Sequence, residues 1–173
     1  MSRAFVKETD GESGDEPLPP DSPHPLYVTP DGLAELRSRH DALAAEVAGR
    51  SPPAEPAAAQ HFQRQRRELR LLERKLARAV EIDPAQHPAD AVAFGHWVTA
   101  EDDDGHDSLY RIVGEDQADP AHGWISWLSP LAQALRGASA GDRVVWRRPA
   151  GDLALTVLAI GTEAPLAERP RRG

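Results

Sequence analysis

The stretch Tyr110–Asp142, YRIVGEDQADPAHGWISWLSPLAQALRGASAGD, decides the fold of this chain. It begins with four residues typical of a β-strand, continues through an acidic loop and enters a second apolar run. Ser129 and Pro130 then predict the start of a short helix, because a serine hydroxyl caps a helix N-terminus and proline is tolerated at the first helical position. Gly137 suits the left-handed residue just beyond that helix. The stretch therefore predicts strand, loop, strand and short helix.

Strand patterns flank this stretch on both sides. Residues 92–99 alternate between apolar and other side chains, and the acidic run Glu101–Asp107 has Asp-Gly at its centre, which is typical of a hairpin turn. We interpret that run as a solvated turn and not as an ion site. Residues 144–146 and 153–158 predict a second hairpin around Pro149–Asp152. Residues 91–160 should therefore form a small antiparallel sheet with one short helix packed on it.

Residues 26–83 carry a helical pattern in two parts. The first helix is predicted to begin at Pro30, with Thr29 as its N-cap, and to end at Gly49. The second runs from about Ala57 to Ile82, and the prolines of residues 52–56 separate the two. The simplest packing is an antiparallel helical hairpin, a short coiled coil. The predicted fold class is therefore α+β.

Composition and charge limit the structures and functions that are possible for the remaining residues. Residues 1–25 read as a disordered acidic tail rich in proline, residues 84–90 as a linker, and residues 161–173 as a second disordered tail. The chain has a net charge of −8 and no cysteine, which excludes disulfides and thiolate metal sites. It lacks a signal-peptide core and any apolar run near the roughly 18 residues of a membrane span. We therefore expect a cytoplasmic protein that does not enter a membrane.

The order of these features resembles the GreA/GreB family of bacterial transcription elongation factors, and GreB in particular. The resemblance covers roughly Leu26–Ile160 and implies an FKBP-like arrangement of the C-terminal domain. It is carried by the hairpin pattern and by Tyr27-Val28-Thr29-Pro30, Ile112-Val113-Gly114, Ile125-Ser126, Ser129-Pro130-Leu131-Ala132 and Gly141-Asp142.

The resemblance implies a function on RNA polymerase. In this family the C-terminal domain docks at the rim of the polymerase secondary channel, and the helical hairpin enters the channel. A tip motif, Gly-Asp-x-x-Glu-Asn, brings two carboxylates to the active centre, where they help to hold Mg²⁺ while the polymerase cuts backtracked RNA. This sequence has Arg50 where the family has aspartate, and Glu55 is the only acid of its tip, Gly49–Glu55. The first predicted helix is also shorter than the family's.

The predicted function is therefore that of a polymerase-binding elongation factor or regulator that does not stimulate transcript cleavage and is not itself an enzyme. The resemblance assigns docking on the polymerase to Leu128, Ser129 and Pro130, although Ser129 and Pro130 also serve to start a helix. RNA or DNA would lie nearby only within the transcription complex. The histidines show no ligand spacing, so no metal or cofactor is predicted.

Two further interpretations stay open. One is a cleavage-competent Gre factor that combines Glu55 with an acid of the polymerase. The other is an FKBP-like peptide-binding module or prolyl isomerase, which needs an aromatic-lined pocket. The aromatic candidates for that pocket are Trp97, Trp124, Trp127, Trp146 and Tyr110.

The second predicted helix also carries a basic face, which consists of Arg67, Arg70, Arg74 and Arg78. These arginines are either solvated or in contact with RNA or the polymerase.

Overall fold

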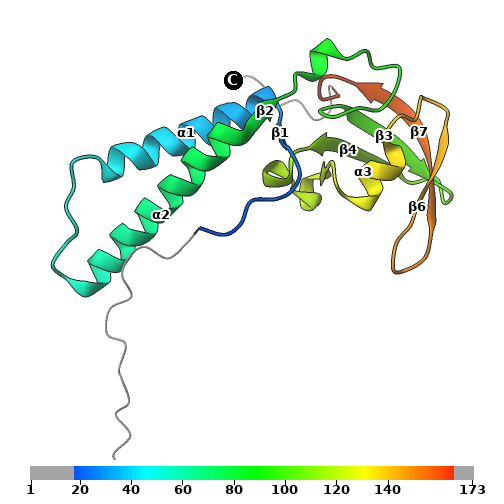
Figure 1. Ribbon diagram of the computed structural model, residues 1–173. Coiled ribbons are helices and arrows are strands. Elements are labelled where there is room, and N and C mark those ends of the chain that lie inside the picture. Colours follow the sequence, from blue (N-terminus) through cyan, green and yellow to red (C-terminus); the bar gives the residue numbers. More distant parts are fainter. Residues whose placement is uncertain (1–17, 166–173) are drawn as a thin grey trace, which may run out of the picture. The chain divides into compact units, whose positions relative to one another are not determined.

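The computed structural model describes residues 18–165, and their contacts divide them into two compact units (Figure 1). One unit contains Leu36–Ala77 together with residues 18–23, and the other contains His24–Glu35 and the chain from Arg78 onward. Residues 1–17 and 166–173 of the two predicted tails lie outside the described residues. The predicted disorder and the predicted domain boundaries therefore stay predictions.

The predicted helical hairpin is present. Helix α1 spans Pro30–Val47 and helix α2 spans Pro56–Arg78. Arg39 of α1 forms an ion pair with Glu68 of α2 at 3.0 Å, and Glu46 accepts a hydrogen bond from Gln65 at 2.7 Å. The residue further along α1 thus contacts the residue that comes earlier in α2, as an antiparallel arrangement of the two helices requires (Figure 1).

Helix α1 begins at Pro30 as predicted and ends at Val47, two residues before the predicted Gly49. The Thr29 hydroxyl accepts a hydrogen bond from the Gly32 backbone N–H at 3.3 Å, which caps the helix N-terminus. Gly49 lies just beyond the last turn with φ of 67°, a left-handed conformation that glycine adopts without the steric cost of a side chain.

The end of the second helix differs from its prediction. Helix α2 stops at Arg78 and not at Ile82, because Ala79–Glu81 forms strand β2. That strand pairs in parallel with β1, Leu26–Val28. The backbone hydrogen bonds of this pairing replace those of another helical turn, and the partner strand lies more than 50 residues earlier in the chain. The helical periodicity of the sequence gives no indication of this strand pairing.

The C-terminal part forms a five-stranded sheet with the order β5-β4-β3-β7-β6. Both predicted hairpins are present as the antiparallel pairs β3–β4 and β6–β7. Strand β5 instead pairs in parallel with β4, so the sheet is mixed and not wholly antiparallel. The strands are Trp97–Asp102 (β3), Asp107–Val113 (β4), Trp124–Ser126 (β5), Arg143–Trp146 (β6) and Leu153–Gly161 (β7).

The connection between β4 and β5 explains the parallel pairing. It contains two short 3₁₀ turns, η2 at Glu115–Gln117 and η3 at Pro120–His122, and carries the chain back along the sheet edge. Gly123 ends it with φ of 73°. The alternating pattern of residues 91–96 also forms no strand, since the first strand of the sheet begins at Trp97.

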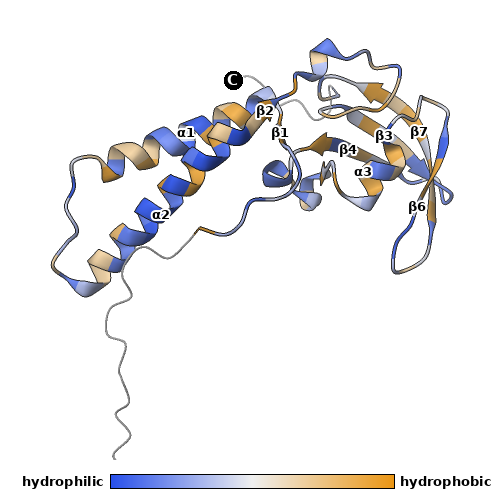
Figure 2. Ribbon diagram, in the orientation of Figure 1, coloured by the Kyte–Doolittle hydropathy of each residue, from blue (hydrophilic) through white to orange (hydrophobic). Residues whose placement is uncertain are grey.

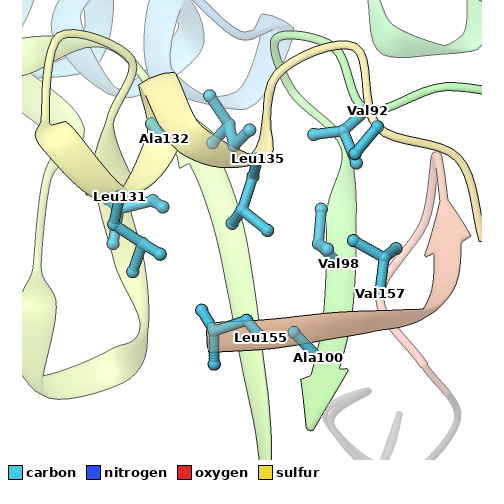
Figure 3. Packing of buried hydrophobic residues seen from close by; sticks show 11 residues of the cluster. Val92, Val98, Ala100, Leu131, Ala132, Leu135, Leu155 and Val157 are labelled. Carbon is cyan, nitrogen blue, oxygen red and sulfur yellow. The ribbon is translucent and has the colours of Figure 1, made fainter. Parts of the chain in front are cut away.

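A short helix, α3, covers one face of the sheet and closes the core. It spans Pro130–Leu135, and it begins where the sequence predicts. Leu135 is fully buried, and Val98 and Val157 from neighbouring strands are fully buried with it (Figure 3). This cluster fixes the position of α3, and hence of the turn that precedes it.

The surface of the hairpin is strongly polar. Figure 2 shows α2 coloured mainly as hydrophilic, with apolar residues confined to part of its surface. Phe62 and Leu72, two residues of the predicted seam, are 2% and 4% exposed. Among the residues that the structure describes, no helix has the length and apolarity that a membrane crossing requires.

Within residues 18–165, His96 is the buried titratable residue of the sheet unit. Its Nδ1 accepts a hydrogen bond from the Ala93 backbone N–H at 3.2 Å, so the proton of the neutral ring lies on Nε2. Burial lowers the pKa of His96, because desolvation disfavours the charged imidazolium. His96 is therefore held neutral near pH 7.

We expect His96 to make the sheet unit less stable in mild acid. Below the usual histidine pKa of about 6.5, the unfolded chain binds a proton that the folded chain does not, so stability falls as pH decreases from there toward the lowered pKa. The slope from this residue is at most about 1.4 kcal/mol per pH unit. Urea unfolding followed by tryptophan fluorescence at pH 7 and pH 5.5 would measure it.

The control is the exposed His61 in helix α2. His96→Gln should flatten the pH dependence of the sheet unit, whereas His61→Gln should leave it unchanged. An equal slope in the wild type and in a folded His96→Gln variant would contradict the prediction.

Candidate functional site

The turn between β5 and α3 is held by a dense set of hydrogen bonds. The Ser129 hydroxyl accepts from the Ala132 N–H at 3.2 Å, so Ser129 is the N-cap of α3. The Ser126 hydroxyl accepts from the Leu128 N–H at 3.2 Å, and the Ser126 carbonyl accepts from the Ser129 N–H at 2.8 Å. Gln133 donates its side-chain amide to the Trp127 carbonyl at 2.7 Å. The turn is therefore fixed at both ends by its own residues.

This turn brings together the three residues of the predicted docking site. Pro130 is exposed, whereas Leu128 and Ser129 are half-buried. On the other side of the same turn, Leu131 and Leu135 are buried in the core (Figure 3). We call Leu128, Ser129 and Pro130 the docking turn. It presents two apolar side chains to solvent on a rigid support.

A small cavity lies beside the docking turn. Its volume is about 200 Å³, and its lining is apolar except for Arg136. Tyr27 packs on Trp127 with ring centroids 4.9 Å apart and on Phe94 at 5.8 Å. The Trp127 indole nitrogen is buried and has no hydrogen-bond partner among residues 18–165. The cavity is lined by Tyr27, Ala93, Phe94, Ile112, Trp127, Ala132 and Arg136.

The aromatic residues predicted to form one pocket are not gathered in it. Only Trp127 lines this cavity, and Tyr27 and Phe94 supply the other rings. Trp97 and Trp124 lie on either side of the Arg111 guanidinium, with centroids 5.4 and 5.2 Å from it. The strand order places Trp97 and Trp124 on the two strands beside β4, where they line a separate cavity of about 600 Å³. Trp146 stacks with Arg148, and Tyr110 packs against the main core.

The Arg111 side chain also holds the start of α1, a contact that sequence reasoning missed. Its two terminal nitrogens donate to both carboxylate oxygens of Asp31 at 2.6 and 2.8 Å. Burial alone would raise the pKa of Asp31, but the hydrogen bonds from Arg111 and Thr29 outweigh it and hold that pKa below its usual value. Asp31 and Arg111 are 80 residues apart in sequence, so no local pattern could have revealed the pair.

The hairpin tip presents few ligands for a cation. Arg50 folds back, with one terminal nitrogen donating to the Glu46 carbonyl at 3.2 Å and its guanidinium 5.8 Å from the centre of the Phe62 ring. Glu55 precedes the first residue of α2, and its carbonyl accepts from the Ala59 N–H at 2.8 Å. The Glu55 carboxylate is exposed at a helix N-terminus, where the helix dipole favours a negative charge. The Glu46 carboxylate receives the Gln65 hydrogen bond.

The predicted basic face of α2 lies on one side of the helix, as its spacing requires, but it is not simply solvated. All four arginines are half-buried. Arg74 donates to the Pro19 carbonyl at 2.6 Å, and its Nε lies 3.1 Å from the Asp21 carboxylate. Arg78 donates to the His24 carbonyl at 3.4 Å. The chain's own residues 19–24 therefore contact part of this face.

The turn between β3 and β4 gathers three potential metal ligands. Oxygen or nitrogen atoms of Asp102, Asp104 and His106 lie within 4.8 Å of one another. The Asp102 carboxylate accepts backbone hydrogen bonds from the other two residues, both at 2.9 Å. The His106 hydrogen bond is the main cause that lowers the Asp102 pKa. These bonds close an exposed hairpin turn, which accounts for the cluster without an ion.

Known proteins are similar to the C-terminal part of the chain and to much of the rest of it. Residues 87–162 match the family model "Transcription elongation factor, GreA/GreB, C-term". The chain is 34% identical over 151 residues to transcription elongation factor GreB of Pseudomonas aeruginosa, an alignment that covers 78% of this chain and 89% of that protein.

Other similarities are more local. GreB of Neisseria meningitidis serogroup B is 41% identical over 95 residues, which cover 54% of this chain and 58% of that protein. GreA of an Anaeromyxobacter strain is 48% identical over 82 residues, which cover 47% and 49%. The chain thus matches only about half of these relatives' length. The crystal structure of GreA factor homolog 1 of Thermus thermophilus aligns at 22% identity and a TM-score of 0.39, with 80% of this chain and 99% of that chain covered.

Proposed function

Because the chain belongs to the GreA/GreB family of transcription elongation factors, we propose that it binds RNA polymerase at the rim of the secondary channel and regulates transcription without stimulating RNA cleavage. The polymerase would be its partner, and any chemistry would belong to the polymerase. RNA and DNA would be close to the protein only inside that complex.

The docking turn supports the polymerase contact. It presents Leu128 and Pro130 on a support that the four hydrogen bonds described above and the buried side of α3 hold in place. A rigid apolar protrusion loses little conformational entropy on binding, which favours affinity. The cavity beside the turn adds a recess of about 200 Å³ that can take an apolar side chain of the partner. This turn is the observation on which the proposed contact rests.

The hairpin tip supports the absence of cleavage stimulation. Arg50, where the family has aspartate, folds toward Phe62, and Glu55 is the one acid between residues 48 and 55. Helix α1 has 18 residues and is therefore about 27 Å long at 1.5 Å per residue. A hard cation such as Mg²⁺ needs several oxygen ligands at close range, and this tip offers one carboxylate.

Binding to core polymerase is the direct test of the proposal. Immobilised protein should retain purified bacterial core polymerase at micromolar concentration, and a cleavage-competent Gre factor should displace it, because both would use the channel rim. A folded protein that retains no polymerase, as judged beside a Gre factor immobilised in the same way, would refute the proposed function.

Replacement of the docking turn should weaken polymerase binding about tenfold, which corresponds to about 1.4 kcal/mol. In the Ser129→Ala/Pro130→Gly double variant, the apolar protrusion and the helix cap are both lost. The lost cap should also cost the sheet unit about 1 kcal/mol of stability. Titration by fluorescence anisotropy would measure binding, and a urea melt would measure stability.

Two further variants separate docking from folding. Ser129→Asp keeps an N-cap, so it should preserve stability while the added charge weakens docking. The Ser51→Ala/Pro52→Gly variant changes the exposed Ser-Pro pair of the hairpin loop and should leave the affinity within twofold of the wild type. If the folded Ser129→Ala/Pro130→Gly variant bound as tightly as the wild type, docking would have to lie elsewhere.

The peptide-binding alternative has two cavities in its favour, the aromatic cavity beside α3 and a second cavity lined in part by Trp97 and Trp124. The first measures about 200 Å³, less than the roughly 300–1,000 Å³ of usual ligand pockets, and it fits one side chain of a docking partner better than a proline-containing peptide segment. The second measures about 600 Å³, but acidic, amide and imidazole side chains make up much of its lining, whereas ligand pockets are lined mainly by apolar residues. Turnover of a proline-containing test peptide by the protein would favour this alternative over docking.

A further inference from the structure

The cavity beside Trp97 and Trp124 has a lining that suits a cation. Its volume is about 600 Å³, and its whole lining belongs to the unit that contains the sheet. Three carboxylates reach it, one from α1 and two from the connection between β4 and β5, and no lysine or arginine is among the described residues of the lining. The charged, imidazole and aromatic residues of the lining are Glu35, Asp116, Asp119, His122, Trp97 and Trp124.

The negative charge of this cavity is only partly compensated inside the protein. The Asp119 carboxylate lies 2.6 Å from a ring nitrogen of His122, and this hydrogen bond is the main cause that lowers the pKa of Asp119. The Glu35 carboxylate is exposed, and within residues 18–165 it has no hydrogen-bond or ion-pair partner. The nearby Arg111 guanidinium adds no net positive charge, because both carboxylate oxygens of Asp31 bind it. A cation is therefore attracted to the cavity.

The spacing of the lining carboxylates suits an organic cation and not a metal ion. Within residues 18–165, three ligand atoms come within 4.8 Å of one another at Asp102, Asp104 and His106, and these residues do not line the cavity. A metal ion such as Mg²⁺ or Ca²⁺ needs oxygen ligands gathered at about 2.0–2.6 Å. A larger organic cation meets separate carboxylates with different N–H groups.

The two tryptophan rings favour a guanidinium over an ammonium. They already hold one guanidinium, since that of Arg111 lies 5.4 Å from the centre of the Trp97 ring and 5.2 Å from that of Trp124. Both tryptophans also line the cavity, so they can contact a second cation from there. A planar guanidinium stacks on an aromatic ring and pairs with a carboxylate through two N–H groups, whereas a lysine ammonium is a compact and strongly hydrated point charge.

We propose that this cavity binds an arginine side chain of a protein partner. The rings of Trp97 and Trp124 contact the guanidinium, and the three lining carboxylates neutralise it. The lining offers no basic residue to the carboxylate of a free amino acid, so an arginine inside a polypeptide, whose carboxyl group is an amide, is the better ligand. This inference goes beyond the proposed function and does not require polymerase binding.

An arginine peptide tests the site in the full-length protein. The probe is acetyl-Gly-Arg-Gly-amide, and the indole N–H signals of the four tryptophans in the ¹⁵N-labelled protein report where it binds. The signals of Trp97 and Trp124 should shift and saturate, whereas those of Trp127 and Trp146 should stay in place. A dissociation constant of about 1 mM is expected, because exposed ion pairs and cation–π contacts are each weak.

Matched peptides test which property of the ligand is recognised. A peptide with citrulline in place of arginine has nearly the same shape without the charge, and it should shift neither signal. A lysine peptide should bind about threefold more weakly than the arginine peptide, because its ammonium stacks and pairs less well. Binding of the arginine peptide should be largely lost near 1 M salt, where the Debye length is about 3 Å.

A triple variant tests the carboxylates. Glu35→Gln, Asp116→Asn and Asp119→Asn together should weaken binding of the arginine peptide about tenfold at low salt. Asparagine at position 119 can still accept the hydrogen bond from the Ala121 N–H, so the turn that follows it is preserved. The control has the same net charge and changes three exposed acids of the same unit outside the lining, and it should lose less than twofold. Its changes are Asp90→Asn, Asp107→Asn and Asp152→Asn.

The outcomes decide the proposal in either direction. Saturable shifts of Trp97 and Trp124 that need the arginine charge and the three carboxylates support it. Absent shifts, equal shifts with the citrulline peptide, or an equal loss of affinity in both triple variants overturn it. Equal affinity for the lysine peptide overturns the assignment to arginine. If the triple variant fails to fold, the comparison of arginine and citrulline peptides on the wild-type protein decides by itself.

Discussion

Addition of the purified protein to a backtracked elongation complex is expected to leave the RNA at its original length. A chimaera that carries a full-length acidic Gre hairpin on the C-terminal domain of this chain should instead shorten the RNA. Metal-assisted hydrolysis gains several kcal/mol from correctly placed anionic ligands, which corresponds to at least about a hundredfold in rate. Gel analysis of labelled RNA over time, with and without the protein, would measure the difference.

The missing carboxylates of the hairpin tip and the short length of the hairpin contribute separately to this expectation. Carboxylates ligate Mg²⁺ at about 2.1 Å, so a tip that stops short of the active centre contributes nothing even when its acids are restored. Replacing Arg50 and Pro53 with acids should therefore restore less cleavage than the chimaera does. In the proposed mode of binding the chimaera docks through the docking turn, so adding the Ser129→Ala/Pro130→Gly change to it should reduce its effect again.

Glu55 is the control residue for the unmodified protein. Glu55→Gln should change nothing in the cleavage assay, because one exposed carboxylate does not make a metal site. Efficient RNA shortening by the unmodified protein, lost in Glu55→Gln, would instead establish the cleavage-competent alternative. It would leave the docking assignment intact.

Leu135→Ala is expected to lower the free energy of unfolding of the sheet unit by about 2–5 kcal/mol. Leu135 is fully buried between α3 and the sheet, and it packs in the same cluster as Val98, Leu155 and Val157 (Figure 3). Truncation removes three carbon atoms from this core and leaves a cavity that the neighbouring strands can fill only in part. The loss is a large fraction of the roughly 5–15 kcal/mol that stabilises a typical domain.

The tryptophans make this measurement specific to one unit. All four, Trp97, Trp124, Trp127 and Trp146, belong to the unit that contains the sheet, so their fluorescence reports its unfolding, while circular dichroism at 222 nm follows mainly the hairpin. Leu158→Ala is the matched control, because Leu158 is 42% exposed and should cost less than about 0.5 kcal/mol. A cost below 1 kcal/mol for Leu135→Ala would mean that α3 does not close the core. The docking turn would then lack its support.

Short-range signals determined most of the secondary structure from the sequence alone. Ser129 and Pro130 start α3 because a hydroxyl cap and a fixed φ act within one turn of the chain. Thr29 and Gly49 bound α1 for the same kind of reason, and the Asp-Gly of residues 104 and 105 closes the first hairpin. The docking turn could be located for this reason. Its role in binding comes from the family resemblance and is proposed.

Only the tertiary structure decided which distant residues meet. The end of α2 at Arg78, the parallel pairing of β5, the Arg111–Asp31 pair and the contact of Asp21 with Arg74 all join residues that no local pattern connects. The aromatic cavity beside α3 is of the same kind, since its rings come from three separate segments. Local signals act through backbone geometry over a few residues. Burial and ion pairing act between whatever surfaces the completed fold brings together, and those surfaces are fixed only when the chain has folded.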